Sequence, residues 1–165
     1  QLAIGKIVSL SCFAVLSGLS SFIGVILSLP KLMNGIIGAN TAAFYSVGDY
    51  FMLFGIIISV VLVIISAFSV ISAYAKSVKE ASSLITPLMM VILIMGMASM
   101  FVSTSSVGLY AIPLLGSGLV ISSIMTFSIS PLGVVLSILS NLVVSVVLIV
   151  LLSFMFKSEK IMFNK

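Results

Sequence analysis

Few residues in this chain of 165 could carry out acid–base, nucleophilic or metal chemistry. The sequence has seven lysines, three acidic residues and one cysteine, Cys12, and it lacks arginine, histidine and tryptophan. Membrane hydrolases and metalloenzymes need paired carboxylates, His or Cys ligands, or a nucleophile beside a base. None of the acidic residues lies inside an apolar segment, and Asp49 and Glu80 are expected on opposite sides of a membrane. We therefore predict no catalytic residues, no metal site and no cofactor in this chain.

The composition is that of an integral membrane protein. Hydrophobic residues make up 62% of the chain and charged residues 6%, and the mean hydropathy is +1.49. Soluble domains are about half apolar and about one-quarter charged, so lipid must solvate much of this surface. The net charge of +4 is concentrated at the ends of apolar segments, which is typical of topology signals and not of a nucleic-acid surface. We expect a multi-pass protein of the cell membrane.

Four apolar segments are long enough to cross a bilayer as helices, which needs about 20 residues each. They cover residues 7–29, 50–75, 83–103 and 132–156, and we predict an all-α bundle that forms one transmembrane domain over 1–165. Pro30 should end the first span, with a loop over 30–48. Ser46 is the expected N-cap of the second span, with Asp49 near its positive end. Asp49 could instead bind a substrate or a cation.

Two features inside the spans have both a structural and a functional interpretation. Asn141 is the only amide of the last span, and in lipid it is expensive unless it bonds to another helix. We interpret it first as a contact between helices and second as a pathway residue. The methionines of the third span could line a pathway for an apolar substrate or serve only in packing; they are Met89, Met90, Met95, Met97 and Met100.

The segment 109–131, LYAIPLLGSGLVISSIMTFSISP, is apolar but interrupted by Pro113, Gly116, Gly118 and Pro131. Lysines place the loop at 76–81 and the C-terminus in the cytoplasm by the positive-inside rule. The spans 83–103 and 132–156 already make an even number of crossings between them. Segment 109–131 should therefore enter and leave on the outer face as a re-entrant hairpin that turns near 116–118. The competing topology has five full spans and a reversed tail.

The order of several short motifs resembles the C-terminal half of an ABC-2 type transporter permease, in particular the sodium-efflux branch. These motifs are Ile-Gly-Lys at 4–6, AYAKSVKEA at 73–81, ITPLMMVILIMG at 85–96, LYAIPLL at 109–115 and FKSEKIMFNK at 156–165. The resemblance implies that the four spans are the third to sixth of a six-span permease, with an outer-face hairpin before the last. It also implies that the first half of the permease lies outside this sequence. The stretch LLGSGLV after Pro113 is less polar than in relatives, which argues against a substrate role there.

The resemblance further implies an exporter in which two permease protomers form the pathway and a separate cytoplasmic ABC ATPase drives it. The charged residues expected on the cytoplasmic face are then candidates to contact that ATPase; they are Lys6, Lys76, Lys79 and Glu80. The alternative is that these lysines only set topology. The hairpin could close the exit of the pathway. A passive channel or a structural membrane subunit is the rival function, and no span contains a carboxylate that could bind sodium.

Overall fold

The computed structural model describes residues 2–37, 46–102 and 107–162, and all regular structure in those ranges is helical. The elements are α1 (Leu2–Ile37), α2 (Val47–Tyr74), α3 (Val78–Phe101), the 3-10 helix η2 (Val107–Ala111), α4 (Leu115–Met125) and α5 (Pro131–Met162). The predicted all-α class is confirmed. Three helices are long and apolar enough to cross a membrane, namely α2, α3 and the Pro131–Met155 part of α5. The chain is therefore a membrane protein built as a helix bundle.

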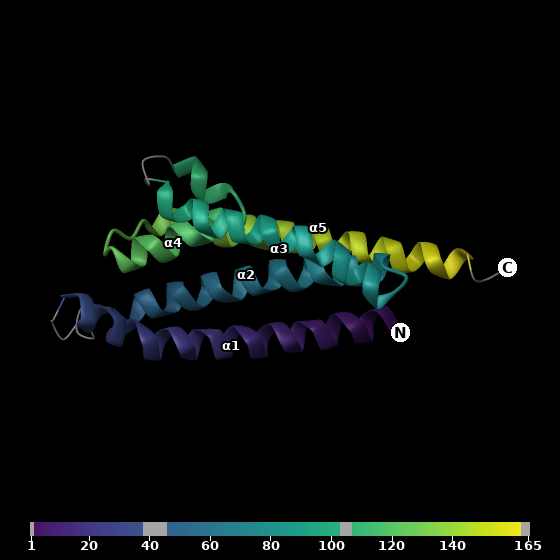
Figure 1. Cartoon of the computed structure of the whole chain (residues 1–165), viewed down its shortest axis with the longest axis horizontal. Helices are drawn as coiled ribbons and strands as arrows, with labels where there is room; N and C mark the ends of the chain where they lie inside the picture. Colours follow the sequence, from purple (N-terminus) through teal and green to yellow (C-terminus); the bar gives the residue numbers. More distant parts are fainter. Residues whose placement is uncertain (1, 38–45, 103–106, 163–165) are drawn as a thin grey trace.

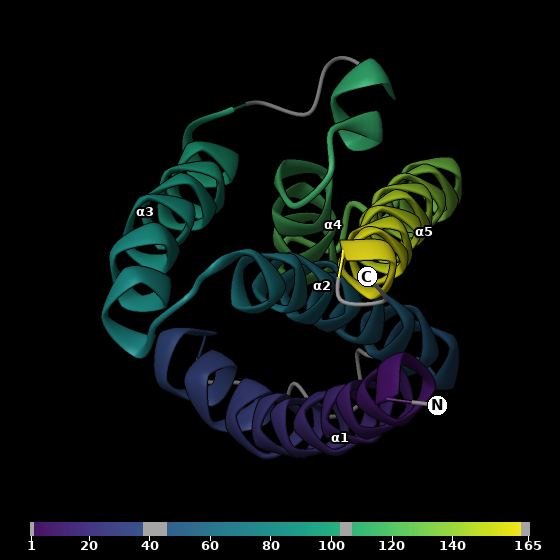
Figure 2. The same cartoon turned by 90° about the vertical axis from the view of Figure 1, so that its right-hand side faces the viewer.

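The four long helices lie lengthwise beside one another (Figure 1). Helix α1 begins, and α5 ends, at the end of the bundle that also holds the turn between α2 and α3. We name this the termini end. The short helix α4 lies at the opposite end, which we name the hairpin end. In the view along the bundle, α2 is central, α1 and α5 flank it, and α3 stands at the outside (Figure 2).

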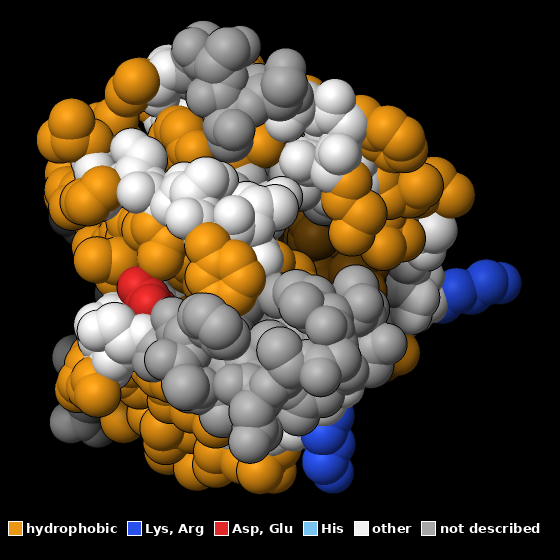
Figure 3. Space-filling model, turned by 90° about the vertical axis from the view of Figure 1, so that its left-hand side faces the viewer, with side chains coloured by type: hydrophobic (Ala, Val, Ile, Leu, Met, Phe, Trp, Pro, Cys, Tyr) orange, Lys and Arg blue, Asp and Glu red, His pale blue; other side chains and the backbone are white. Residues whose placement is uncertain are grey.

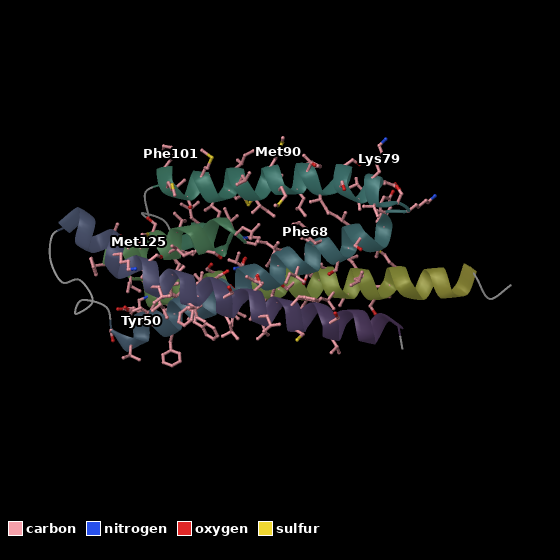
Figure 4. All side chains as sticks on the ribbon, turned by 60° about the horizontal axis from the view of Figure 1, so that its bottom comes forward. Tyr50, Phe68, Lys79, Met90, Phe101 and Met125 are labelled. Carbon is pink, nitrogen blue, oxygen red and sulfur yellow. The ribbon has the colours of Figure 1, made fainter. Side chains whose placement is uncertain are left out.

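The segment from η2 to α4, residues 107–125, is the η2–α4 hairpin. Figure 4 places Phe101 and Met125 at one end of the bundle and Lys79 at the other. The chain thus leaves α3 and begins α5 at the same end, with the η2–α4 hairpin between them. Buried hydrophobic side chains gather where this hairpin meets α2 and α5; they are Leu53, Ile56, Ile57, Tyr110, Leu119, Val120, Ile124 and Val134. The core of the molecule therefore lies beneath the η2–α4 hairpin.

The turn of this hairpin differs from the predicted one. We expected the chain to turn near 116–118, but it turns at 112–114, and Gly116 and Gly118 already lie in α4. Pro113 has no backbone N–H and cannot contribute one to a helix. Leu114 then takes a positive φ of 65°, so the reversal is complete before the glycines begin.

Helix α1 is longer than predicted. We expected it to end at residue 29 and a loop to cover 30–48, but it continues through Pro30 to Ile37. A proline removes one backbone hydrogen bond from a helix and bends it without requiring that it end. The rest of the predicted loop up to residue 45 lies outside the described residues.

The predicted cap of α2 is confirmed. The Ser46 Oγ accepts a hydrogen bond from the Gly48 N–H at 3.4 Å, and Asp49 Oδ2 accepts one from the Ser46 N–H at 2.8 Å. This reciprocal arrangement is a capping box, which satisfies donors that a helix start would leave unpaired. The geometry therefore favours the capping role of Asp49.

Helix α3 is mostly exposed in this chain. Pro87 lies inside it, as predicted, and Ser99 is its only residue classed as buried. Met89, Met90, Met97 and Met100 are exposed, and Met90 points away from the other helices (Figure 4). These four methionine side chains therefore do not belong to the buried core of the described chain.

Candidate functional site: a buried polar hub beneath the hairpin

A cluster of polar side chains lies buried between α2, α4 and α5, and we name it the polar hub. Its members are Ser59, Ser117, Ser137 and Asn141, each at most 2% exposed. The Asn141 Nδ2 donates hydrogen bonds to Ser117 Oγ at 2.7 Å and to Ser59 Oγ at 3.0 Å. One amide thus joins three helices.

The same amide also holds the turn of the hairpin. Its Oδ1 accepts a hydrogen bond from the Leu114 N–H at 3.1 Å. A backbone N–H can only donate, so this contact identifies the oxygen of the amide and leaves the nitrogen facing the two serines. Asn141 therefore uses both of its donors and one acceptor on other helices or on the turn. Its predicted role as a contact between helices agrees with this geometry.

The serines of the hub complete the network. Ser117 and Ser137 share a hydrogen bond between their hydroxyl oxygens at 3.2 Å. Ser59 Oγ donates to the Ile56 carbonyl at 2.8 Å while it accepts from Asn141. Because buried polar groups in lipid are costly when unpaired, this mutual satisfaction is what allows the hub to exist.

A further bond from α5 reaches the other side of the turn. Ser140 Oγ donates to the Ala111 carbonyl at 2.6 Å. Residues 137, 140 and 141 lie on one face of α5 because they are separated by three and four positions. That face therefore forms hydrogen bonds with the η2–α4 hairpin at three places: Ala111 before the reversal, Leu114 in the reversal, and Ser117 at the start of α4.

Small residues let the backbones approach closely around the hub. A Cβ at Gly116 would collide with the Tyr110 carbonyl, and one at Gly118 would collide with the Ser99 side chain on α3. A Cβ at Gly133 would lie 2.9 Å from the Tyr110 ring. Gly116 and Gly118, predicted as hairpin residues, thus serve in packing and not in the turn itself.

The turn contains an unusual backbone conformation at Leu114. Its φ is 65° and its ψ is −50°, and the Leu115 N–H donates to the Pro113 carbonyl at 2.8 Å. This is a γ-turn of the strained form, which is rare in proteins. A non-glycine residue keeps such a conformation only when its surroundings hold it there.

Pro131, the last residue of the predicted hairpin, is instead the first residue of α5. Ser130 precedes it, and its Oγ accepts a hydrogen bond from the Gly133 N–H at 3.4 Å. Proline is favoured at the first position of a helix because its missing N–H would have no partner there. Pro131 therefore marks the start of the last long helix.

The candidate ATPase-facing residues lie at the termini end. Lys76 and Lys79 are exposed in the turn before α3 and in its first turn. Glu80 Oε2 accepts a hydrogen bond from the Lys76 N–H at 3.0 Å, and the Glu80 N–H donates to Ser77 Oγ at 3.2 Å. Glu80 is thus engaged in a helix cap that we did not predict. Lys6 belongs to α1, and its side chain lies outside the described part of the chain.

The serine members of the hub were not singled out from the sequence as site residues. A local signal does exist on α5, because Ser137, Asn141 and Ser145 are spaced by four residues and so share one face. Ser145 Oγ donates to the Asn141 carbonyl at 2.9 Å. Nothing comparable marks Ser117, which lies between two glycines.

No family model, curated protein or solved structure matches this chain. The class of protein is therefore given by the fold and the hub together. It is an all-helical membrane protein whose last long helix binds a short hairpin through buried hydrogen bonds.

Proposed function

We propose that this chain is part of the permease of an ATP-driven ABC-2 type exporter. A separate cytoplasmic ATPase drives it, and two permease protomers form the substrate pathway. The observation that carries this proposal is the η2–α4 hairpin, which precedes the last long helix and lies at the end of the bundle away from the termini (Figure 1). This is the placement that the resemblance to ABC-2 permeases implies.

The distribution of charge also supports the proposal. The exposed side chains of Lys76 and Lys79 lie at the end of the bundle where α1 begins and α5 ends. The space-filling view of the hairpin end shows hydrophobic side chains over the flanks of the described surface (Figure 3). Short cytoplasmic loops carry an excess of lysine, so the termini end is where we expect an ATPase to bind.

The test is a pull-down from detergent of the protein with a candidate P-loop ATPase, which is sought first in the neighbouring open reading frames. The double variant Lys76→Glu and Lys79→Glu should reduce the retained ATPase at least about threefold, because surface charge pairs determine encounter and register. Lys31→Glu is the matched control. Lys31 is also exposed, but it lies in the last two turns of α1, toward the hairpin end.

Flux of candidate substrates from vesicles should then require both ATP and the ATPase. Equal ATPase retention by the double variant and by Lys31→Glu would show that the two lysines set topology only. Flux that persists without ATP would identify a passive channel and overturn the proposal.

A further inference from the structure

The turn of the η2–α4 hairpin combines an unfavourable backbone with a strong set of restraints. Leu114 has φ 65° and ψ −50°, where its Cβ is crowded by the neighbouring carbonyl groups. No glycine occupies this position, although two glycines follow within four residues. The restraints must therefore come from outside the turn.

Those restraints come mainly from α5. Asn141, which is fully buried, accepts the Leu114 N–H through its Oδ1. Ser140 holds the Ala111 carbonyl on one side of the turn, and Asn141 holds Ser117 on the other. Ser59 on α2 accepts a hydrogen bond from the same amide. One face of α5 thus binds the chain both before and after the strained residue.

We propose that Leu114 and Asn141 form a loaded latch. The Asn141 amide holds the η2–α4 hairpin against α2 and α5, and the turn at Leu114 stores backbone strain that favours release of the hairpin. A strained residue raises the free energy of the docked state relative to any state in which the turn relaxes. When the hydrogen bonds of the hub break, the hairpin loses the contacts that hold it against α2 and α5. The strain at Leu114 then also favours its release.

The latch requires only the membrane-embedded bundle and not ATP-driven transport. An experiment that refutes the latch would not refute the proposed permease function, and one that refutes the permease function would not refute the latch. The measurement should therefore follow opening of the hairpin and not flux.

The reporter is the rate at which a buried thiol reacts with N-ethylmaleimide in the full chain reconstituted in liposomes. Val120 on α4 is 1% exposed, so a cysteine there reacts only when the hairpin moves and water reaches it. Val120→Cys is placed in a Cys12→Ser background because the native thiol is exposed. Val107→Cys, at a position that is 56% exposed, supplies the rate of an unprotected thiol.

The amide arm tests the hydrogen bonds. Asn141→Leu should raise the labelling rate of Val120→Cys about tenfold or more, because several bonds between helices are lost together. Ser59→Ala should raise it about threefold. Ser69→Ala is the matched control for Ser59→Ala: both serines are buried on α2 and donate to their own helix, but only Ser59 accepts from Asn141.

The backbone arm tests the strain. Leu114→Ala removes the side-chain packing but keeps the Cβ that creates the strain, whereas Leu114→Gly removes both. Labelling should be at least about threefold slower in Leu114→Gly than in Leu114→Ala, because glycine adopts this conformation freely. At a position with negative φ we would expect faster labelling in the glycine variant than in the alanine variant, because glycine has more conformational entropy in the released state.

Both arms have a result that overturns the latch. Labelling that is equal or faster in Leu114→Gly than in Leu114→Ala would show that the turn stores no strain. Asn141→Leu within twofold of its parent would show that the amide does not hold the hairpin. If Asn141→Leu fails to fold, the Ser59→Ala and Ser69→Ala pair decides this arm, and equal rates in that pair overturn it.

Discussion

At the scale of single residues, Asn141 connects three helices and the turn of the hairpin through its side-chain amide. An amide in a membrane helix is tolerated when it finds partners on neighbouring helices. Asn141 finds them on α2, on α4 and on the backbone of the turn. Its loss would leave the partly buried Leu114 N–H without its acceptor, and an unpaired donor of this kind carries a desolvation cost.

We predict that Asn141→Ala destabilises the protein by about 2–4 kcal/mol, which combines an unpaired backbone N–H with two lost bonds between helices. The measurement is reversible unfolding in mixed detergent micelles followed by circular dichroism. Ser69→Ala, whose hydroxyl bonds only to the Ile65 carbonyl of its own helix, should change stability by less than about 1 kcal/mol. A loss of similar size in both variants would contradict a special role for the hub.

At the scale of elements, α4 is held by two close approaches that only glycine permits. Gly116 packs on the Tyr110 carbonyl, which belongs to backbone and cannot rotate away. Gly118 packs on the Ser99 side chain, which belongs to a different helix and can be removed by mutation. The two glycines are therefore distinguishable by experiment.

We predict that Gly116→Ala and Gly118→Ala each destabilise the protein by about 1–3 kcal/mol through overpacking. Adding Ser99→Gly should recover most of the loss for Gly118→Ala and none for Gly116→Ala. Gly96→Ala on α3 is the control, because its Cβ would meet nothing within 4 Å and alanine favours helix by up to about 1 kcal/mol. Unfolding in detergent measures the three single variants and the two double variants. Rescue of both glycine variants by Ser99→Gly would refute this assignment of contacts.

At the scale of the whole molecule, the number of membrane crossings follows from where the chain enters and leaves each helix. The hairpin end holds the end of α3, the hairpin and the beginning of α5, and the termini end holds the turn between α2 and α3 (Figure 1). A hairpin that returns to its own side puts the turn between α2 and α3 and the C-terminal end of α5 on the same side of the membrane. A full crossing by residues 109–131 would place them on opposite sides.

We predict that single cysteines at Val107, the first residue of the η2–α4 hairpin, and at Ser128, shortly after its last residue, react with a membrane-impermeant maleimide from the outer face. Val78→Cys, at the first residue of α3, should react only from the cytoplasmic face. All three positions are exposed, and the background is again Cys12→Ser. Labelling in intact cells and in inverted vesicles separates the two faces. Reaction of positions 107 and 128 from opposite faces would establish a full crossing and would contradict the predicted topology together with the proposed family.

The sequence by itself determined the class of this protein, the approximate positions of α2, α3 and α5, and the cap of α2. Composition and periodicity are properties of short stretches, and Ser46 and Asp49 lie within one helical turn of each other. Asn141 was recognisable for the same reason, since an amide in an apolar span must find a partner. The extension of α1 through Pro30 was missed because a proline makes a helix end favourable without requiring it.

Only the tertiary structure decided which residues satisfy Asn141 and how the hairpin turns. Ser59 lies 82 residues away from it in the chain and Ser117 lies 24 away, so no local pattern connects them. The same packing explains the segment 109–131. Its glycines suggested a flexible turn, but they are needed where α4 meets Tyr110 and Ser99. The reversal falls instead on Leu114, whose positive φ is maintained because α5 binds its N–H from outside the segment.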